Sequence, residues 1–295
     1  MSRSDWAILL ILSVLWGGSF FFIGIAIHSV TPLTLVLLRV SLASAFLWVW
    51  RLVRREPLGL SMKVAPALTV LALFNNVLPF ILFAWAQRTI PSGLASILNA
   101  TTPIWGVIVA HLFTHDERMT PAKIVGVLLG FVGVAVMIGA ELLGDLGTDV
   151  LAQLACLFAT LCYALAGVWG RRFRRIGVAP VGVATGSLTA AALVLVPLVL
   201  LFEPPWHATA PAPEAWAALM GLAFFCTALA YILYFKLLAS AGATNSLLVT
   251  FLIPVTAILL GTFVLGEQLA PRHFAGMALI GLGLAAIDGR LLRRG

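Results

Sequence analysis

The chain has 295 residues, of which 62% are hydrophobic and only 10% are charged, and its formal net charge is +7 at pH 7. A mean hydropathy of +1.09 excludes a soluble globular domain, because a chain of this size could not hide so much apolar surface from water. The basic residues fall in short loops between apolar stretches, which also excludes a nucleic-acid partner.

Long uncharged stretches run through the sequence, and each exceeds the roughly 20 residues needed to cross a ~30 Å hydrocarbon core. The first follows Arg3 and is longer than the roughly 7–15 apolar residues of a signal peptide, so we expect a retained helix there. The sequence therefore predicts an all-α integral membrane protein with ten transmembrane helices, at residues 6–27, 32–53, 64–87, 91–113, 121–141, 150–171, 179–202, 214–237, 243–265 and 272–291.

The two halves of the chain repeat each other. From Glu117 onward the offset between matching residues is a constant 150, and upstream Pro32 and Pro180 open corresponding helices. Because each copy holds an odd number of helices, we expect the second copy to enter the bilayer inverted, as in carriers that alternate access around a midplane site. The predicted repeats are residues 1–145 and 146–295. The matched positions are Pro103, Glu117, Pro121, Gly126, Gly133 and Gly139 in the first copy and Pro254, Glu267, Pro271, Gly276, Gly283 and Gly289 in the second.

The basic residues predict the orientation. With both termini in the cytoplasm, fifteen of the eighteen Lys and Arg residues lie inside, only Arg88 and Arg272 lie outside, and Arg39 sits within a helix. This distribution follows the positive-inside rule. The loops after equivalent helices of the two copies carry opposite charge bias, which agrees with an inverted second copy.

No acidic residue lies near the midpoint of a predicted helix. Ion-coupled carriers commonly place a carboxylate there, so its absence favours a facilitator or coupling through another group. His111 could titrate, but its position near a helix end favours a solvated or hydrogen-bonded side chain. The three cysteines lie in helices without disulfide or metal spacing, so we expect no metal and no cofactor.

Prolines occupy the middle part of three predicted helices, and each removes a backbone hydrogen bond and frees the carbonyl four residues earlier. We interpret these prolines as gating kinks: Pro79, Pro103 and Pro254. The residues with freed carbonyls are Asn75, Asn99 and Thr250, and Asn76 adds a further amide. These polar groups predict the lining of a midplane cavity, although side chains of this kind also join neighbouring helices without any ligand.

Aromatic residues on the same helices complete the predicted pocket: Trp16, Phe20, Phe74, Tyr163, Trp169, Phe224, Tyr231 and Tyr234. Polar groups beside aromatic faces suit a substrate with an apolar or aromatic side chain. Lipid-facing aromatic residues are an alternative for any one of them. Arg39 could attract a substrate carboxylate or tie helix ends together, and we favour the structural role.

The chain resembles the ten-helix EamA-type branch of the drug/metabolite transporter superfamily. The residues that carry the resemblance are Trp16-Gly17-Gly18-Ser19, Arg39, Pro91-Ser92-Gly93-Leu94-Ala95 with Pro103, Glu117, Gly126 and Gly133, and Ala241-Gly242-Ala243 with Pro254, Gly266-Glu267, Gly276 and Gly283. The first copy departs from the pattern at His115-Asp116-Glu117, where the second keeps Gly266-Glu267.

The resemblance implies a bacterial inner-membrane exporter of amino acids or related metabolites, and the aromatic amino acid exporters of the YddG type look nearest. Its cavity would lie among the first, third, fourth, sixth, eighth and ninth helices. We expect a monomer or weak dimer that binds a small molecule and is surrounded by lipid. The alternatives are a proton-coupled exporter of other metabolites or drugs, and, from other classes, an intramembrane enzyme or a channel. An enzyme would need a buried acid–base pair or metal ligands, and a channel would need a filter or charged rings; the sequence offers neither.

Overall fold

The computed structural model describes residues 2–56, 62–114, 119–138, 148–204, 210–246 and 249–288, and these residues form helices and no strands. Eight helical spans of at least 18 residues are apolar enough to cross a membrane, and two shorter apolar helices, Leu252–Val264 and Pro271–Ile287, accompany them. The prediction of an all-α membrane fold is therefore confirmed. Its helices are α1 (Arg3–Ala26), α2 (Pro32–Arg54), α3 (Ala65–Ala72), α4 (Leu78–Ala86), α5 (Ser92–Asn99), α6 (Thr102–Phe113), α7 (Pro121–Ile138), α8 (Thr148–Arg175), α9 (Pro180–Phe202), α10 (Pro213–Ala223), α11 (Ala230–Ser246), α12 (Val249–Val264) and α13 (Pro271–Asp288).

Two of the predicted helices contain a wide π-helical turn. The turn η2 (Leu73–Val77) joins α3 to α4, and η5 (Phe224–Leu229) joins α10 to α11. In η2 the N–H of Leu78 reaches back five residues to the carbonyl of Leu73. Pro79 follows at once, in the first turn of α4, where its missing N–H is tolerated. The helical span Ala65–Ala86 thus agrees with the predicted helix over residues 64–87 and holds the wide turn just before Pro79.

The predicted helix over residues 91–113 is also divided. It ends as α5 at Asn99 and restarts as α6 at Thr102, with Pro103 in the first turn. The Thr102 hydroxyl donates to the carbonyl of Asn99 over 2.7 Å, so this carbonyl is not left free as predicted. Pro254 does lie inside its helix, α12. Gly242 interrupts the helical backbone of α11 with a positive φ of +79°, which glycine adopts readily. This break lies close to the predicted start of the ninth helix at residue 243.

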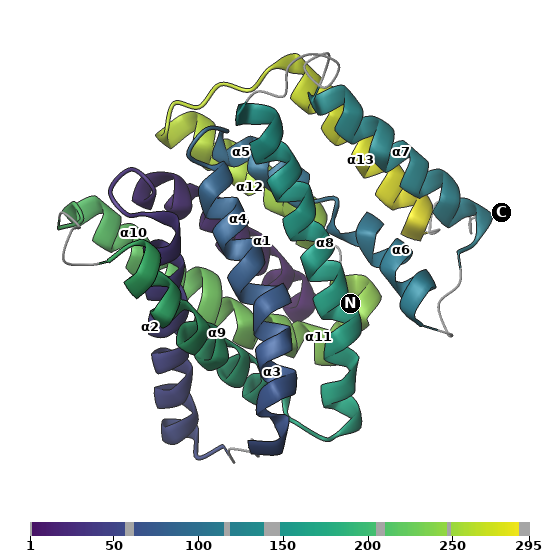
Figure 1. Ribbon diagram of the computed structural model, residues 1–295. Helices are drawn as coiled ribbons and strands as arrows, with labels where there is room; N and C mark the ends of the chain where they lie inside the picture. The colour runs from purple at the N-terminus through teal and green to yellow at the C-terminus, as the bar shows by residue number, and fades with distance from the viewer. Residues whose placement is uncertain are drawn as a thin grey trace.

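Helices α7 and α13 form a closely packed antiparallel pair at one side of the bundle (Figure 1). A Cβ atom at Gly126 would lie 2.5 Å from the carbonyl oxygen of Gly283, and one at Gly133 would lie 2.8 Å from that of Gly276. Only glycine allows backbones to approach so closely. These glycines therefore form the packing seam between α7 and α13.

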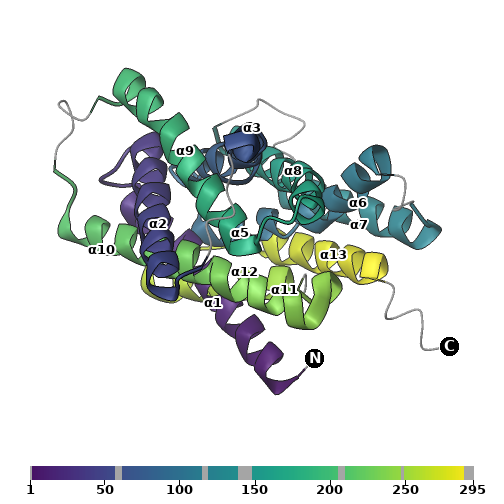
Figure 2. The same ribbon diagram turned by 90° about the horizontal axis from the view of Figure 1, so that it is seen from below.

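The rest of the bundle packs around two large hydrophobic clusters. Helices α2 and α9 pack against each other, and in Figure 2 they lie on the opposite side of the bundle from α7 and α13. Helix α1 contacts α10, α11 and α12, and α8 contacts α3, α4, α5 and α6. Tyr163 of α8 packs against both clusters, so it lies where the two parts of the core meet.

Candidate functional site

The first polar group of the site joins η2 to α11. The Asn75 Nδ2 atom donates to the Tyr231 hydroxyl over 3.1 Å, and that hydroxyl donates to Asn76 Oδ1 over 2.9 Å. Asn76 is fully buried, whereas Asn75 and Tyr231 are half-buried. Asn75 and Asn76 thus meet Tyr231 across 156 and 155 positions of sequence. All three side chains were predicted as pocket lining.

Arg39 forms a second polar contact on the same two helical segments. Its Nε atom donates to the Thr227 hydroxyl over 2.9 Å, and its guanidinium lies 3.7 Å from the centre of the Phe80 ring. Phe80 follows Asn76 by four residues, and Thr227 precedes Tyr231 by four residues. Because residues four apart lie near one helix face, Arg39 contacts the same two helical segments that carry the asparagine group and Tyr231.

The wide turns help to position these residues. Thr227 lies within η5, and its hydroxyl donates over 2.8 Å to the carbonyl of Leu222, five residues earlier. Asn75 and Asn76 lie within η2. A π-turn inserts one residue into a helix and rotates the side chains that follow, and such turns occur frequently at functional sites. The two turns occupy equivalent places in the two copies of the repeat, about 150 residues apart.

Aromatic rings surround this polar group. Trp16 packs on Tyr234 with ring centres 5.3 Å apart, and Phe83 contacts both Phe20 at 5.4 Å and Tyr163 at 6.2 Å. The Tyr163 and Tyr231 hydroxyls both interact electrostatically with Arg39. Four predicted pocket residues, Trp16, Phe20, Tyr163 and Tyr234, therefore belong to aromatic pairs in the centre of the bundle.

Other predicted pocket residues lie elsewhere. Trp169 donates from its indole nitrogen to the Ala67 carbonyl over 3.0 Å and is covered by Arg172, near the basic end of α8. Phe74 packs in the same small cluster as Trp169. Phe224 makes an edge-to-face contact with Phe46 of α2, at a centre-to-centre distance of 5.3 Å. No contact between described residues joins these three side chains to the asparagine group.

Asn99 and Thr250 are half-buried at the end of α5 and the start of α12. Neither side chain forms a hydrogen bond within the described parts of the chain, and neither is brought to Tyr231 by a described contact. Their role as pocket lining, and the gating role of the three prolines, stay predictions. His111 is exposed and accepts a hydrogen bond from the backbone of Met119 over 3.3 Å.

The sequence reasoning missed Thr227 and assigned Arg39 to a structural role. Thr227 gave no signal, because a threonine in an apolar helix is common and its wide turn has no adjacent proline. Arg39 did give one, because it is the only basic residue well inside a predicted helix and away from its ends. What the sequence could not supply was the proximity of Arg39 to Tyr163 and Tyr231, 124 and 192 residues away.

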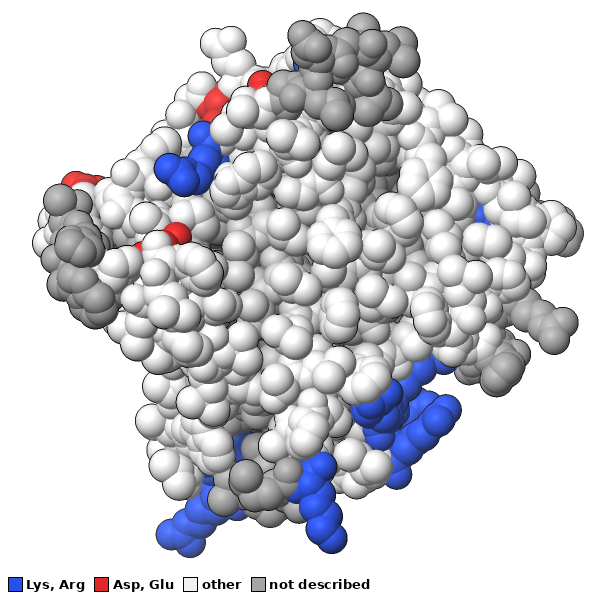
Figure 3. All heavy atoms as spheres, in the orientation of Figure 1, with Lys and Arg blue, Asp and Glu red and all other residues white. Residues whose placement is uncertain are grey.

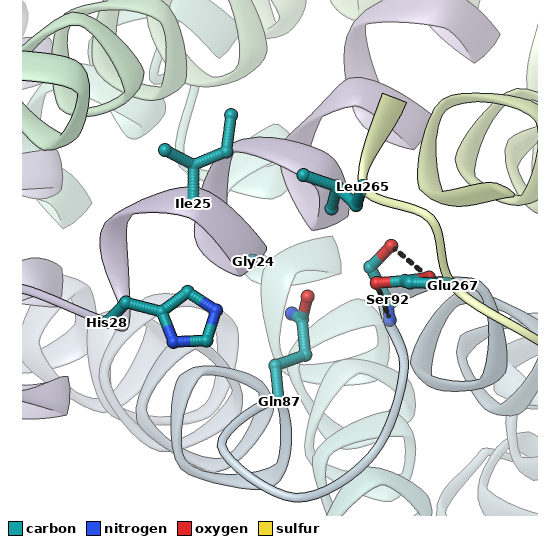
Figure 4. Close-up of a pocket in the computed structure, with 7 residues that line it drawn as sticks. All are labelled: Gly24, Ile25, His28, Gln87, Ser92, Leu265 and Glu267. Carbon is teal, nitrogen blue, oxygen red and sulfur yellow. Dashed lines mark hydrogen bonds between the residues drawn. The ribbon is translucent and has the colours of Figure 1, made fainter. Parts of the chain in front are cut away.

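A pocket of about 310 Å³ opens near the ends of α1, α4 and α12 (Figure 4). His28, Gln87, Ser92 and Glu267 are the polar residues of its lining. The Glu267 carboxylate accepts from the Ser92 backbone N–H over 2.8 Å, from the Ser92 hydroxyl over 2.9 Å and from the Gly93 N–H over 3.2 Å. It therefore caps the N-terminus of α5, where a negative charge is favoured by the helix dipole.

A second carboxylate caps α2 in the same way. Glu203, at the end of α9, accepts from the Thr34 backbone N–H over 2.8 Å and from the Leu33 N–H over 3.3 Å. The hydroxyls of Thr31 and Thr34 also donate to it. Glu203 and Glu267 thus tie loops of the second half of the chain to helices of the first half. The equivalent loop of the first copy, with Glu117, lies outside the described residues.

Comparison with known proteins agrees with this architecture. The model of the EamA-like transporter family matches residues 5–139 and 150–287. The chain is 27% identical to a protein of Salmonella typhimurium named as a probable amino-acid metabolite efflux pump, over 96% of this chain and 94% of that one. It is 25% identical to the uncharacterized inner membrane transporter YedA of Escherichia coli, over 91% and 85% of the two chains. A solved crystal structure covers the full length of both chains with a TM-score of 0.69 at 23% identity, which shows the shared fold.

Proposed function

The chain belongs to the EamA-like transporter family, and we propose that it carries aromatic or large neutral amino acids out across the bacterial inner membrane. The observation that carries this proposal is the group of Asn75, Asn76 and Tyr231, which joins a helix of each half of the chain inside the bundle. Amide and hydroxyl groups beside aromatic rings suit a zwitterion with an apolar side chain. The name of the Salmonella relative, a probable amino-acid metabolite efflux pump, supports the coarser class of amino-acid compounds.

The contact between α7 and α13 supports two inverted repeats, residues 1–145 and 146–295. Gly126 meets Gly283 and Gly133 meets Gly276, whereas the sequence repeat pairs Gly126 with Gly276 and Gly133 with Gly283. Equivalent helices that contact through exchanged positions are the product of a two-fold axis. Because the helices run antiparallel, this axis lies across them, in the plane of the membrane. The two stretches matched by the family model have nearly the same bounds as the repeats.

The distribution of charge supports cytoplasmic termini. On the face seen in Figure 3, most Lys and Arg side chains gather at the lower edge, where α2 and α8 end in basic residues. The visible Asp and Glu side chains lie in the upper half. Under the positive-inside rule the lower edge faces the cytoplasm.

In the proposed mechanism the two halves rock about the central group and expose it to each side in turn. Glu203 and Glu267 lie on the side assigned to the outside, and they tie the second half of the chain to α2 and α5. These contacts close the outer entrance, and their release opens it. The acidic side chains of the described residues lie at helix ends, so none of these carboxylates is placed to bind a coupling ion in the centre, which supports uncoupled transport.

Counterflow in proteoliposomes tests this function. Vesicles that contain purified protein and unlabelled phenylalanine should accumulate labelled phenylalanine transiently, with saturable rates that do not change with an imposed pH gradient. The matched control is protein with Asn75→Ala, which removes one member of the central group and should lower the rate. Gradient-driven accumulation would contradict uncoupled transport, and the lack of counterflow with every neutral amino acid would contradict the substrate class.

A further inference from the structure

Arg39 is a buried cation whose charge is only partly compensated. Its side chain is 6% exposed, and Thr227 is its one hydrogen-bond partner, through Nε. The Phe80 ring offers its face at 3.7 Å, which favours a cation but accepts no hydrogen bond of ordinary strength. Within the described residues, the two terminal nitrogens of Arg39 have no hydrogen-bond partner.

Among the described residues, no carboxylate is placed to pair with this guanidinium. Asp5, Glu203 and Glu267, the described acidic side chains with hydrogen bonds, use their oxygens at helix N-termini or on Ser240. A buried charge without a partner is strongly unfavourable, because desolvation is not offset by an opposite charge. Arg39 therefore has an electrostatic deficit that a bound anion would remove.

The neighbouring polar group adds a spare donor. Asn76 is fully buried and its Nδ2 atom has no hydrogen-bond partner, while its Oδ1 atom is used by Tyr231. The site thus offers unused N–H groups and one positive charge, because Arg39 contacts Phe80 and Thr227 on the helical segments that continue from Asn76 and lead to Tyr231. A planar guanidinium edge matches the two oxygens of a carboxylate.

We propose that Arg39 binds the carboxylate of the transported substrate, with Asn76 as a second donor. The inference rests on the proposed function and adds the chemical class, since it requires a carboxylate and not only a polar molecule. Trp16, Tyr234 and Phe83 supply the apolar surface for the remainder of the substrate. Thr227 fixes the guanidinium in place and does not contact the ligand.

The test introduces a carboxylate into the protein itself, beside Arg39, in place of the substrate carboxylate. Thr227→Asp places a carboxylate at the atom that now lies 2.9 Å from Arg39 Nε, and Thr227→Asn is its uncharged control of nearly equal size. Binding is measured by thermal stabilisation of purified protein with L-phenylalanine and with L-phenylalaninamide, which differ only at the carboxylate. Other neutral amino acids and their amides form the rest of the panel.

In the unmodified protein we expect at least a tenfold preference for the amino acid over its amide, as for the loss of a charge-assisted hydrogen bond. Thr227→Asn should keep this preference. Thr227→Asp should abolish it, because the introduced carboxylate occupies Arg39, and should leave the melting temperature without ligand unchanged or higher. Arg39→Gln should also abolish the preference, and Arg39→Lys should restore part of it.

A panel in which no carboxylate is preferred over its amide would overturn the inference, as would equal preferences in Thr227→Asp and Thr227→Asn. Either result is distinguishable from failure of the proposed function. Saturable counterflow of phenylalanine with an equally good amide competitor would leave the carrier standing and remove Arg39 from the site.

Discussion

Tyr231 holds the central group together, because its single hydroxyl serves both Asn75 and Asn76. Tyr231→Phe should leave Asn76 Oδ1 with only the long 3.5 Å hydrogen bond from Asn75 Nδ2, and Asn76 Nδ2, in the same fully buried side chain, already has no partner. We expect a loss of about 1–3 kcal/mol in the free energy of unfolding and slower counterflow. Thermal unfolding and labelled phenylalanine flux measure the two effects.

Tyr234→Phe is the matched control for that change. Tyr234 lies on α11, as Tyr231 does, and its ring packs on Trp16 of α1. Its hydroxyl has no hydrogen bond within the described residues. Its loss should therefore change neither stability nor flux appreciably. If Tyr231→Phe and Tyr234→Phe behave alike, the central hydrogen bonds contribute nothing specific to the carrier.

The polar members of this site could be predicted from sequence only in part. Asn75, Asn76 and Tyr231 were identified because amides and hydroxyls are unusual in the middle of apolar helices. Trp169 and Phe224 were predicted as aromatic residues of the same helices, and they contact Ala67 and Phe46 instead, because an aromatic side chain in a membrane helix packs equally well on any neighbour. To predict the role of Arg39, one must know which helices pack against it, and the local sequence does not contain this information.

Among the helices, the α7–α13 pair gives the sharpest prediction. Gly126→Ala would place a methyl group 2.5 Å from the Gly283 carbonyl oxygen. Because this oxygen belongs to the backbone, it cannot move aside unless the two helices separate. We expect a cost of about 1–3 kcal/mol in the free energy of unfolding. Thermal unfolding in detergent measures it.

Gly281→Ala on α13 serves as the control, because a Cβ atom there meets nothing within 4 Å. It should be neutral or stabilise the helix slightly, since alanine has the higher helix propensity. Equal destabilisation by both substitutions would mean that the glycine seam does not hold the pair.

The carboxylate cap of α5 predicts a separate effect. Glu267→Gln keeps the shape of the side chain but removes the charge that faces the Ser92 and Gly93 N–H groups. A loss of about 0.5–2 kcal/mol is expected in the free energy of unfolding. Glu214→Gln, at an exposed position in the first turn of α10, is the comparison, and an equal loss there would count against a special role for Glu267.

Helix boundaries show where sequence patterns end. Pro32 and Pro180 were predicted to open helices and do so, because proline at the first helical position costs no hydrogen bond. Pro79 and Pro103 lie in the first turns of α4 and α6, inside the predicted spans, where a π-turn and a short break precede them. Apolarity reports residence in a membrane, and it does not report where the backbone hydrogen bonds are interrupted.

At the scale of the whole molecule, these parts fit the proposed carrier, with one site between two related halves. The apolar composition and the spacing of charged loops sufficed to predict a helical membrane protein. The repeat of Gly126 and Gly133 at Gly276 and Gly283 suggested the inverted halves, and their reciprocal contacts support that proposal. The substrate site depends on contacts more than 150 residues apart, so it could not be assembled from local patterns.

Access to the central group from each side is the most direct test of this account. Asn75→Cys, in protein whose buried Cys156, Cys162 and Cys226 are replaced by alanine, places one reactive thiol beside Tyr231. A membrane-impermeant thiol reagent is applied to either face of oriented proteoliposomes, with and without phenylalanine. The account predicts that the thiol is reached from both faces in turn and that saturating phenylalanine slows both reactions. A thiol reached from only one face under every condition, or reactions indifferent to the substrate, would contradict it.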